Sequence, residues 1–280
     1  MKEVIFYLKG NANIDVYDPI KFMRIATYLK DDYKTTNQQC SQDFIRILLN
    51  YINKELIGYR DVYQLNEYRP SKGKEIEKYD KFCKQIFPES LAFSLFTIIS
   101  KAHSYGKFNY CNEIIEDYTF SYNIDQILYL DKCRKRVNFF DVFDLNFLNG
   151  TINIDSPKCH KNIEIKEKNT IIKLPEILIF TLERFFGVKK IVSIENPILI
   201  DLKNYIDIDY RPNRENTIYE LFAVNLRLGK DIKIGHQICI IKREGIWYEI
   251  NDEYVKKCPD FIIDSLRENS YGLFYKKLRL

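Results

Sequence analysis

The stretch that decides the fold lies near the end of the chain and reads YELFAVNLRLG (219–229), GHQICIIKREGIWYEINDEYV (235–255) and SYGLFYKK (270–277). It contains three apolar runs, at residues 221–226, 237–241 and 246–250, each followed by polar residues. Runs rich in Ile, Val, Phe and Tyr with short breaks between them are typical of antiparallel strands joined by tight turns. The stretch therefore predicts a β-sheet.

Two polar residues are brought together by this sheet. If the second and third strands pair about a turn at residues 243–245, residues whose numbers add up to about 487 or 488 face each other, and His236 and Asn251 satisfy that condition. An imidazole beside a carboxamide is the arrangement of a catalytic base and the group that fixes its tautomer. A His at a strand start is also a common surface residue, and Asn-Asp is a common turn pair. Spacing alone leaves both interpretations open.

The stretch also resembles the histidine box of the ubiquitin-specific proteases: Tyr-x-Leu-x-Ala-Val, Gly-His, Trp-x-x-Phe-Asp/Asn-Asp-x-x-Val and Tyr-x-Leu-Phe-Tyr. The residues in register are Tyr219, Leu221, Ala223, Val224, Gly235, His236, Trp247, Asn251, Asp252, Val255, Tyr271, Leu273, Phe274 and Tyr275. Gln237 departs from the pattern, because the family usually has Tyr after the His. The resemblance implies that His236, Asn251 and Asp252 are catalytic. It further implies that Gly235 and Trp247 bind the ubiquitin tail.

A second block, QQCSQDFIRILLNYINKEL (38–56), predicts a helix with one apolar stripe. It resembles the family's Gln-Gln-Asp-Ala-Gln-Glu-Phe-Leu helix, with Asp43 in place of the Glu and Cys40 in place of the Asp. In that family the acidic groups at the helix start receive the arginines near ubiquitin's flexible tail. The resemblance implies that Gln39 and Asp43 bind this tail, while an ordinary amphipathic core helix is the other interpretation.

A third block, LPEILIFTLERF (174–185), is apolar on both faces and predicts a strand in the middle of a sheet. It resembles a family strand that runs beneath the ubiquitin-tail channel, which implies that Arg184 and Phe185 bind the tail. Together the blocks imply an α+β, papain-like cysteine-peptidase fold of the ubiquitin-specific-protease type, incomplete at its N-terminus. We expect one catalytic domain over residues 1–280, with a helical thumb remnant (1–101), a finger β-ribbon (102–173) and a palm β-sheet (174–280).

In this family the finger region is often held together by a zinc ion that two Cys-x-x-Cys pairs coordinate. Here Cys111 and Cys159 fill one position of each pair, and Phe108 and Ser156 stand at the others. A structural zinc site needs four nitrogen or sulfur ligands in a tetrahedron. The residues that could replace the two missing cysteine ligands in an irregular site are His103, His160 and Cys133. We expect that the ligand set is too degraded to hold zinc and that the protein carries no cofactor.

The composition is that of a globular protein, with 46% hydrophobic and 29% charged residues. The net charge of +4 is weak and no dense Lys/Arg cluster is interleaved with aromatics, so nucleic-acid binding is not indicated. The seven cysteines are scattered, and we find no secretory segment and no apolar run near the roughly 18 residues of a membrane helix. We therefore expect an intracellular protein, cytoplasmic or nuclear, with reduced thiols and no membrane partner. The resemblance implies ubiquitin or ubiquitinated proteins as partners.

The resemblance does not extend to the nucleophile. Cysteine deubiquitinases use a thiolate that attacks the carbonyl after ubiquitin's last glycine, while a His accepts and returns a proton. The family's thiol lies in a Gly-Asn-Thr-Cys-Tyr box, many tens of residues before the 38–56 helix. Residues 10–13 (GNAN) echo that box only faintly, with Asn13 where the Cys would be. Cys239 is three residues along a strand from His236 and so points to the opposite face. We expect no efficient protease activity from this chain.

Three hypotheses follow from this missing thiol. The chain is part of an active deubiquitinase whose cysteine box is supplied by a missing N-terminal segment in cis or in trans. Alternatively, it is a natural pseudo-deubiquitinase that binds ubiquitin or holds a partner. A third hypothesis is an unrelated β-rich module with accidental matches. Retention of His236 and Asn251 favours the first, since a binding module needs no base, whereas Cys40, Gln237 and the broken cysteine pairs favour the second.

Overall fold

The computed structural model describes residues 24, 27, 40–56, 91–108, 113–155, 162–186, 188–208, 216–229, 235–259 and 262–279. Of the residues singled out above, Gln39, Cys111, Ser156, Cys159, His160 and residues 10–13 lie outside these ranges. The chain separates into two compact units, Met1–Ile52 and Asn53–Leu280. No helix in the described ranges is long and apolar enough to cross a membrane.

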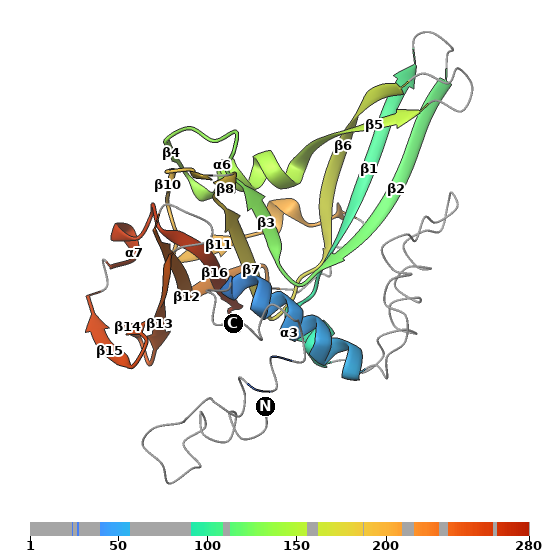
Figure 1. The fold of residues 1–280 in the computed structure, drawn as a ribbon. Helices are drawn as coiled ribbons and strands as arrows, with labels where there is room; N and C mark the ends of the chain where they lie inside the picture. The colour runs from blue at the N-terminus through green and yellow to red at the C-terminus, as the bar shows by residue number, and fades with distance from the viewer. Residues whose placement is uncertain are drawn as a thin grey trace. The chain divides into compact units, whose positions relative to one another are not determined.

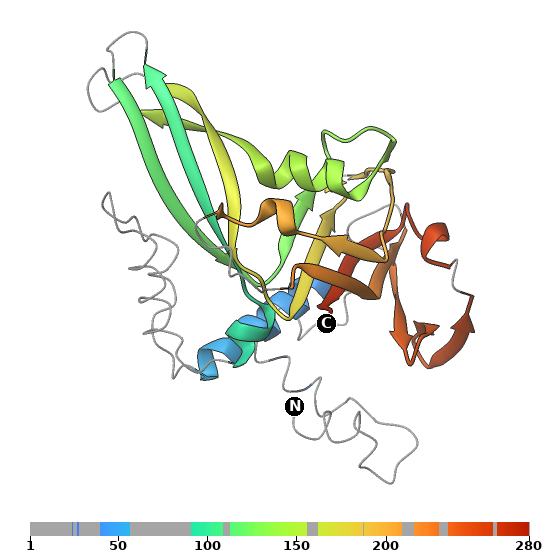
Figure 2. The same cartoon turned by 180° about the vertical axis from the view of Figure 1, so that it is seen from behind.

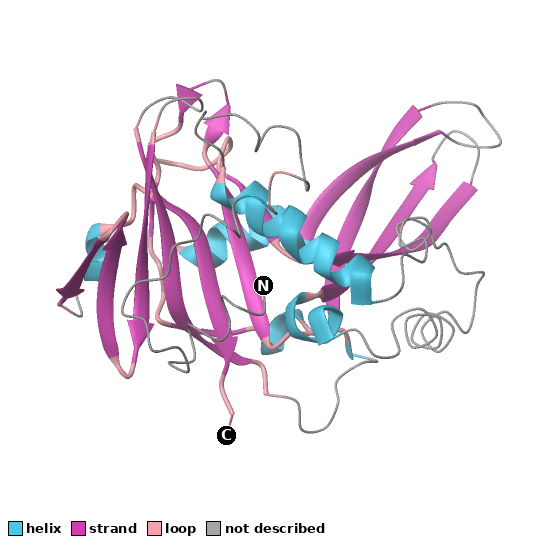
Figure 3. Ribbon diagram, turned by 60° about the horizontal axis from the view of Figure 1, so that its bottom comes forward, coloured by secondary structure: helices cyan, strands magenta, loops and turns pink. Residues whose placement is uncertain are grey.

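The expected helix in the first part of the chain is confirmed. Helix α3 spans Ser41–Leu56 and opens with a hydrogen bond from Phe44 N to Cys40 O at 3.0 Å. Asp43 lies in its first turn, where a carboxylate is favoured by the helix dipole. Its side chain is half exposed and pairs with Arg46, with Arg46 Nη1 3.1 Å from Asp43 Oδ1. Figure 3 draws the described helices in cyan and the strands in magenta.

An eight-stranded sheet dominates the second unit. Its main path runs β15 (Tyr254–Cys258), β14 (Ile246–Asn251), β13 (His236–Arg243), β12 (Ile218–Leu228), β16 (Ser270–Lys277), β7 (Ile177–Glu183) and β3 (Gln126–Tyr129), and β11 (Leu199–Asp201) also pairs with β12 (Figure 1). All neighbours are antiparallel except β3 and β7, which are parallel. The three strands expected from the 219–255 stretch are therefore confirmed, as is the interior position of the 174–185 strand.

A second sheet has four long antiparallel strands. Its order is β2 (Glu113–Asn123), β1 (Ile98–Phe108), β6 (Asn162–Lys173) and β5 (Asn149–Asp155), and it forms a separate ribbon in Figures 1 and 2. Most of the predicted finger region thus consists of this ribbon. The segment is not ribbon throughout, however, because β3 lies within 102–173 and belongs to the eight-stranded sheet. The domain boundaries themselves stay a prediction.

A buried ion pair fastens the four-stranded sheet to the segment that follows β11. Lys101 Nζ on β1 lies 2.7 Å from Asp207 Oδ2, and both side chains are largely buried. Thr170 Oγ1 on β6 donates to the same carboxylate oxygen at 2.7 Å. Asp207 N also donates to Ile171 O at 2.8 Å. A buried pair held by further hydrogen bonds is costly to break from one side only, because the remaining charge is stranded.

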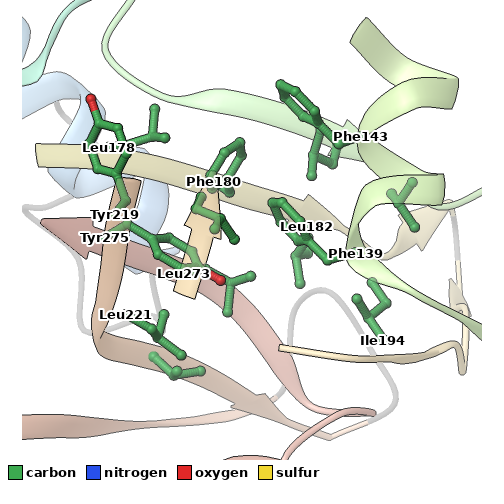
Figure 4. Close-up of a cluster of buried hydrophobic side chains, with 14 of the residues drawn as sticks. Phe139, Phe143, Leu178, Phe180, Leu182, Ile194, Tyr219, Leu221, Leu273 and Tyr275 are labelled. Carbon is green, nitrogen blue, oxygen red and sulfur yellow. The ribbon is translucent and has the colours of Figure 1, made fainter. Parts of the chain in front are cut away.

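The core lies between the eight-stranded sheet and helix α6 (Phe139–Phe143). Asn138 caps α6 by accepting a hydrogen bond from Asp141 N at 2.8 Å. Phe139 and Phe143 stand edge-on to Phe180 of β7, with ring centroids 4.9 and 5.6 Å apart (Figure 4). Tyr275 of β16 packs against the same ring at 5.8 Å. Edge-to-face aromatic pairs of this kind add roughly 0.5–1.5 kcal/mol each beyond their buried area.

The remaining elements are short. They are α5 (Leu91–Phe96), β4 (Arg136–Val137), the π-helix η3 (Asp144–Leu148), β8 (Phe185–Phe186), β9 (Val188–Lys189), β10 (Ser193–Ile194), the 3-10 helix η4 (Lys203–Tyr205) and α7 (Ile262–Ser265). Strands β4 and β10 form a small parallel pair, and β8 and β9 form an antiparallel one.

Candidate functional site

The site is built where β13 begins, at Gly235 and His236. A Cβ on Gly235 would stand 2.5 Å from the backbone oxygen of Leu228 on the neighbouring strand β12. Real Cβ atoms do not approach a backbone oxygen so closely, so only glycine fits at this position. The glycine therefore lets β13 start tightly against β12. Leu228 is the cross-strand partner of His236, so this close approach fixes where the imidazole starts.

The register of β13 and β14 differs from the expected one. Cys239 faces Ile250 and Arg243 faces Ile246, so paired residue numbers add up to 489 rather than 487 or 488. Continuing this register places Asn251 opposite Ile238, two residues from His236 and on the same face of the sheet. Such diagonal neighbours remain within reach of long side chains. The expected register was wrong, while the expected meeting of His236 and Asn251 is confirmed, with His236 Nε2 2.6 Å from Asn251 Oδ1.

This hydrogen bond fixes the tautomer of the neutral ring. A carboxamide oxygen accepts hydrogen bonds and cannot donate them, so His236 Nε2 carries the proton and donates it to Asn251 Oδ1. In the neutral imidazole the other nitrogen, Nδ1, then has the free lone pair. Nδ1 is thus the atom that can accept a proton, and the Nε2 contact holds the ring in one orientation.

Asp252 makes a weaker contact with the same ring. Its Oδ2 lies 3.9 Å from His236 Nε2, and its side chain is 69% exposed while that of His236 is 43% exposed. Asp252 has a φ of 52°, in the left-handed region that Asp tolerates in turns. An ion pair so open to solvent contributes little. Asp252 can stabilise the protonated imidazolium, but Asn251 is the residue that orients the neutral ring.

The described thiols of the second unit are Cys239, Cys258 and Cys133. Cys239 faces Asn225 and Ile250 across the sheet, so it is on the face opposite to His236, and burial raises the pKa of its thiol to about 11. Cys258 is buried opposite Trp247, with its Sγ 3.6 Å from Lys256 O. Burial also raises the pKa of Cys133, whose Sγ is 4.0 Å from Tyr129 O. A raised pKa keeps a thiol protonated and poorly nucleophilic.

Arg184, expected at the ubiquitin tail, is 0% exposed. Its guanidinium donates to Ser270 O at 2.6 Å, Val192 O at 2.6 Å and Arg267 O at 2.9 Å. Burial lowers the pKa of Arg184 to about 10, so the group remains charged at neutral pH. These bonds tie the end of β7 to the start of β16. The guanidinium is engaged within the fold, and a tail contact by Arg184 stays a prediction that this geometry does not favour.

The other expected tail-binding residues are placed as follows. Phe185 is buried beneath Arg227, whose Cζ is 4.9 Å from the ring centroid. Trp247 is 2% exposed and belongs to the hydrophobic core, with Lys242 Nζ 5.8 Å from its ring centroid. Asp43 lies on α3 in the other unit, and the roles of all these residues stay predictions.

Sequence reasoning missed one residue that supports the site. Arg227 on β12 is 5% exposed, and its guanidinium carbon lies over the rings of Phe185 and Tyr271. Its Nε is 3.7 Å from the Cβ position at Gly235. The arginine therefore packs against the residue that precedes His236. A charged residue flanked by Leu226 and Leu228, directly after the apolar run 221–226, is the signal that could have found it.

No group of three or more His, Cys, Asp or Glu side chains in the described ranges is arranged to hold a metal ion. Strand β1 precedes Cys111 in the chain and β6 follows Cys159, and both cysteines lie outside those ranges. The expectation of a degraded zinc site therefore stays a proposal.

Comparisons with known proteins agree on one family. A sequence model of the family described as ubiquitin carboxyl-terminal hydrolase matches residues 1–275. Human ubiquitin carboxyl-terminal hydrolase 42 is 31% identical over 132 residues, which cover 46% of this chain and 10% of the relative. Ubiquitin carboxyl-terminal hydrolase 25 of Arabidopsis thaliana is 22% identical over 263 residues, covering 92% of this chain and 36% of the relative. The chain thus spans only a minor part of these relatives' length.

Solved structures with the same fold include two SAGA DUB modules of Ubp8, Sgf11, Sus1 and Sgf73. One, bound to monoubiquitin, aligns with a TM-score of 0.66 at 19% identity over 93% of this chain and 53% of that chain. Another aligns with a TM-score of 0.69 at 20% identity over 99% of this chain and 58% of that chain. At this identity the likeness shows the fold, and the fold class expected from the sequence is confirmed.

Proposed function

Because the chain belongs to the ubiquitin carboxyl-terminal hydrolase family, we propose that it binds the C-terminal tail of ubiquitin and presents His236 as the proton acceptor for thiol-dependent cleavage of the bond after that tail. The observation that carries this proposal is the 2.6 Å contact between His236 Nε2 and Asn251 Oδ1. It leaves Nδ1 as the basic atom of a ring held in one orientation. A relative of the same fold bound to monoubiquitin supports ubiquitin as the partner.

The proposed chemistry assigns one task to each residue. A thiol transfers its proton to His236 Nδ1, and the resulting thiolate attacks the carbonyl carbon at the end of the ubiquitin tail. The imidazolium then returns the proton to the leaving amine nitrogen as the carbon–nitrogen bond breaks, which leaves the tail as a thioester. Water hydrolyses this thioester, which releases the tail as a carboxylate and regenerates the thiol. Asn251 holds the ring through both steps, and Asp252 adds a weak attraction while the ring is charged.

We further propose that the thiol is none of the cysteines of this chain. The position of Cys239 on the face opposite to His236, the raised pKa values of Cys239 and Cys133, and the core position of Cys258 support this assignment. The sequence also has no match to the family's Gly-Asn-Thr-Cys-Tyr box. A second candidate function, a pseudo-deubiquitinase that binds ubiquitin without cleaving it, rests on that same missing box and on Gln237.

The test of tail binding is a calorimetric titration of the 280-residue chain with ubiquitin and with ubiquitin lacking its two terminal glycines. The proposal predicts saturable binding that weakens at least tenfold with the shortened form. Equal affinity for both forms would contradict tail recognition. Binding of neither form by a folded chain would contradict the proposal as a whole.

The assignment of the thiol is tested by labelling with ubiquitin vinyl sulfone, which forms a covalent adduct with an activated cysteine. We expect no adduct with this chain, and an adduct on any of its cysteines would refute the assignment. The genomic sequence upstream of Met1 separates the two functions. An in-frame Asn-x-Cys-Tyr/Phe block there favours the enzyme, and its absence favours the pseudo-deubiquitinase.

A further inference from the structure

The two edge strands of the eight-stranded sheet, β3 and β15, differ in how their outward-facing backbone groups are covered. At the β3 edge, the side chain of Asn146 takes the place of a neighbouring strand. Its Oδ1 accepts from Tyr129 N at 2.8 Å, and its Nδ2 donates to Tyr129 O at 3.1 Å. This carboxamide caps the exposed backbone of β3, as edge strands require if they are not to pair with other chains. The other edge is β15, which lies beyond β14 (Figure 1).

The backbone groups of β15 that face outward can be identified from its turn. Strands β14 and β15 are joined by the two residues Asp252 and Glu253, so Asn251 and Tyr254 form the closing hydrogen-bonded pair. Backbone groups alternate in direction along a strand. The N–H and C=O of Val255 and Lys257 therefore point away from β14. Within the described part of the chain no strand lies on that side of β15.

The side chains of β15 are open on both faces of the sheet. Tyr254 is 70% exposed and Val255 is 66% exposed, and Lys256 and Lys257 are exposed as well. Alternation places Tyr254 and Lys256 on one face and Val255 and Lys257 on the other. Each face therefore offers an apolar side chain followed by a lysine. Large apolar side chains on an open edge are a liability unless they serve recognition.

We propose that β15 is a docking strand for an extended, acidic segment of another protein, which joins the sheet as an additional strand. This goes beyond the proposed function and requires no bond cleavage. Backbone bonds to Val255 and Lys257 would hold the segment, and side-chain pockets would select it. Because Tyr254 pairs with Asn251, the C-terminal end of an antiparallel docked segment lies beside the candidate site.

The charges of β15 define the segment. Lys256 already faces Glu249 on β14, so Lys257, opposite Tyr248, is the stronger anchor for an acidic side chain. An antiparallel partner strand would place two acidic residues opposite Lys257 and Lys256, followed by two apolar residues opposite Val255 and Tyr254. Pairing with β15 of a second copy would instead bring four lysines together on two adjacent strands, where their like charges repel. Lysines on edge strands commonly prevent such self-pairing.

The experiment measures fluorescence anisotropy of a labelled peptide, Thr-Glu-Glu-Val-Phe-Thr, titrated with the 280-residue chain. We expect saturable binding that Val255→Pro weakens at least tenfold, because proline removes an outward N–H while leaving the bonds to β14 intact. Val255→Thr, which keeps that N–H, is the matched control and should bind as the unmodified chain does. Circular dichroism establishes that both variants are folded.

A charge exchange tests the partner's chemistry. The double variant Lys256→Glu, Lys257→Glu should bind the acidic peptide with an affinity at least tenfold lower than that of the unmodified chain. The same variant should acquire binding to the basic peptide Thr-Lys-Lys-Val-Phe-Thr. The same exchange at the exposed Lys132 and Arg134 should change neither affinity. Equal binding of acidic and basic peptides, or no binding by a folded chain, would overturn the proposal. So would a dimer in sedimentation that Val255→Pro abolishes, because the occupant would then be a second copy.

Discussion

His236 and Asn251 meet side chain to side chain at 2.6 Å although they are diagonal neighbours rather than cross-strand partners. The sheet brings the two residues to one face, and the length of the two side chains closes the remaining gap. Since the amide oxygen only accepts, the contact determines which ring nitrogen carries the proton. The candidate base is therefore oriented by a single hydrogen bond that sequence variants can remove.

Replacing Asn251 by Ala should release the ring while leaving the fold intact. The lost hydrogen bond is half exposed, so the free energy of unfolding should fall by only about 0.5–1.5 kcal/mol. In the variant, NMR spectra of the ring should show both neutral tautomers. Asp252→Asn is the matched control, because Asn tolerates the left-handed backbone at this position and removes the charge, and loss of the exposed 3.9 Å contact should change the unfolding free energy by less than about 1 kcal/mol and leave the tautomer unchanged. A larger effect from Asp252 than from Asn251 would reverse their assigned roles.

Gly235→Ala should destabilise the chain by about 1–3 kcal/mol, because the new methyl group would press on a backbone oxygen 2.5 Å away. Urea unfolding followed by circular dichroism measures the change. At Gly150, in strand β5, the nearest atom to a Cβ is the carboxylate oxygen Oε1 at the flexible end of the Glu167 side chain, at 3.3 Å, and Glu167 Cβ follows at an ordinary contact distance of 3.5 Å. Gly150→Ala should therefore cost less than 1 kcal/mol. Equal losses at the two glycines would show that the close approach at Gly235 is not the cause.

Asp207→Ala should lower the free energy of unfolding by about 3–5 kcal/mol, because it leaves the largely buried Lys101 ammonium without its carboxylate. The double variant Lys101→Met with Asp207→Leu removes both charges and should recover much of that loss. Urea unfolding of the single and double variants gives the comparison. If the double variant is as unstable as the single one, the stranded charge is not the source of the loss.

Cys239 should be alkylated slowly by iodoacetamide at neutral pH, because burial raises its thiol pKa to about 11. The thiolate fraction, and with it the rate, should rise as the pH increases toward 11. Mass spectrometry of digested protein after timed alkylation follows this cysteine individually. Rapid modification at pH 7 would mean that the thiol is activated, and would reopen it as a candidate nucleophile.

The purified chain should contain far less than one zinc ion per molecule, because Phe108 and Ser156 stand at two of the four positions where the family carries cysteines. Inductively coupled plasma mass spectrometry of protein prepared with added zinc measures the number of zinc ions per molecule. Stoichiometric zinc that survives dialysis would contradict this expectation. It would also point to a ligand set drawn from the remaining histidines and cysteines.

The sequence predicted those features that depend on local periodicity. The alternation of apolar residues identified β12, β13, β14 and the interior strand β7, and the helical stripe identified α3. The register of the hairpin was missed because its turn is centred between Glu244 and Gly245, both with positive φ, rather than on residue 244 alone.

Tertiary pairing was the part that periodicity could not supply. Strand β3 pairs in parallel with β7, and each residue of β3 precedes its partner by 54 positions, as Gln126 precedes Phe180. The four residues of β3 do not indicate that partner. Arg184 was expected at the ubiquitin tail because its strand resembles the family strand that runs beneath the tail channel. Its acceptors, at Val192, Arg267 and Ser270, are known only once β16 is placed beside β7.

The most direct test of the account is the proton on the His236 ring. Nitrogen-15 NMR of the imidazole at alkaline pH, with the three histidines distinguished by His103→Gln and His160→Gln variants, reports the tautomer. The account predicts a protonated Nε2 and an unprotonated Nδ1 in the unmodified chain, and loss of that preference in Asn251→Ala. A ring protonated at Nδ1 would contradict it, because the atom assigned to accept the thiol's proton would already be occupied.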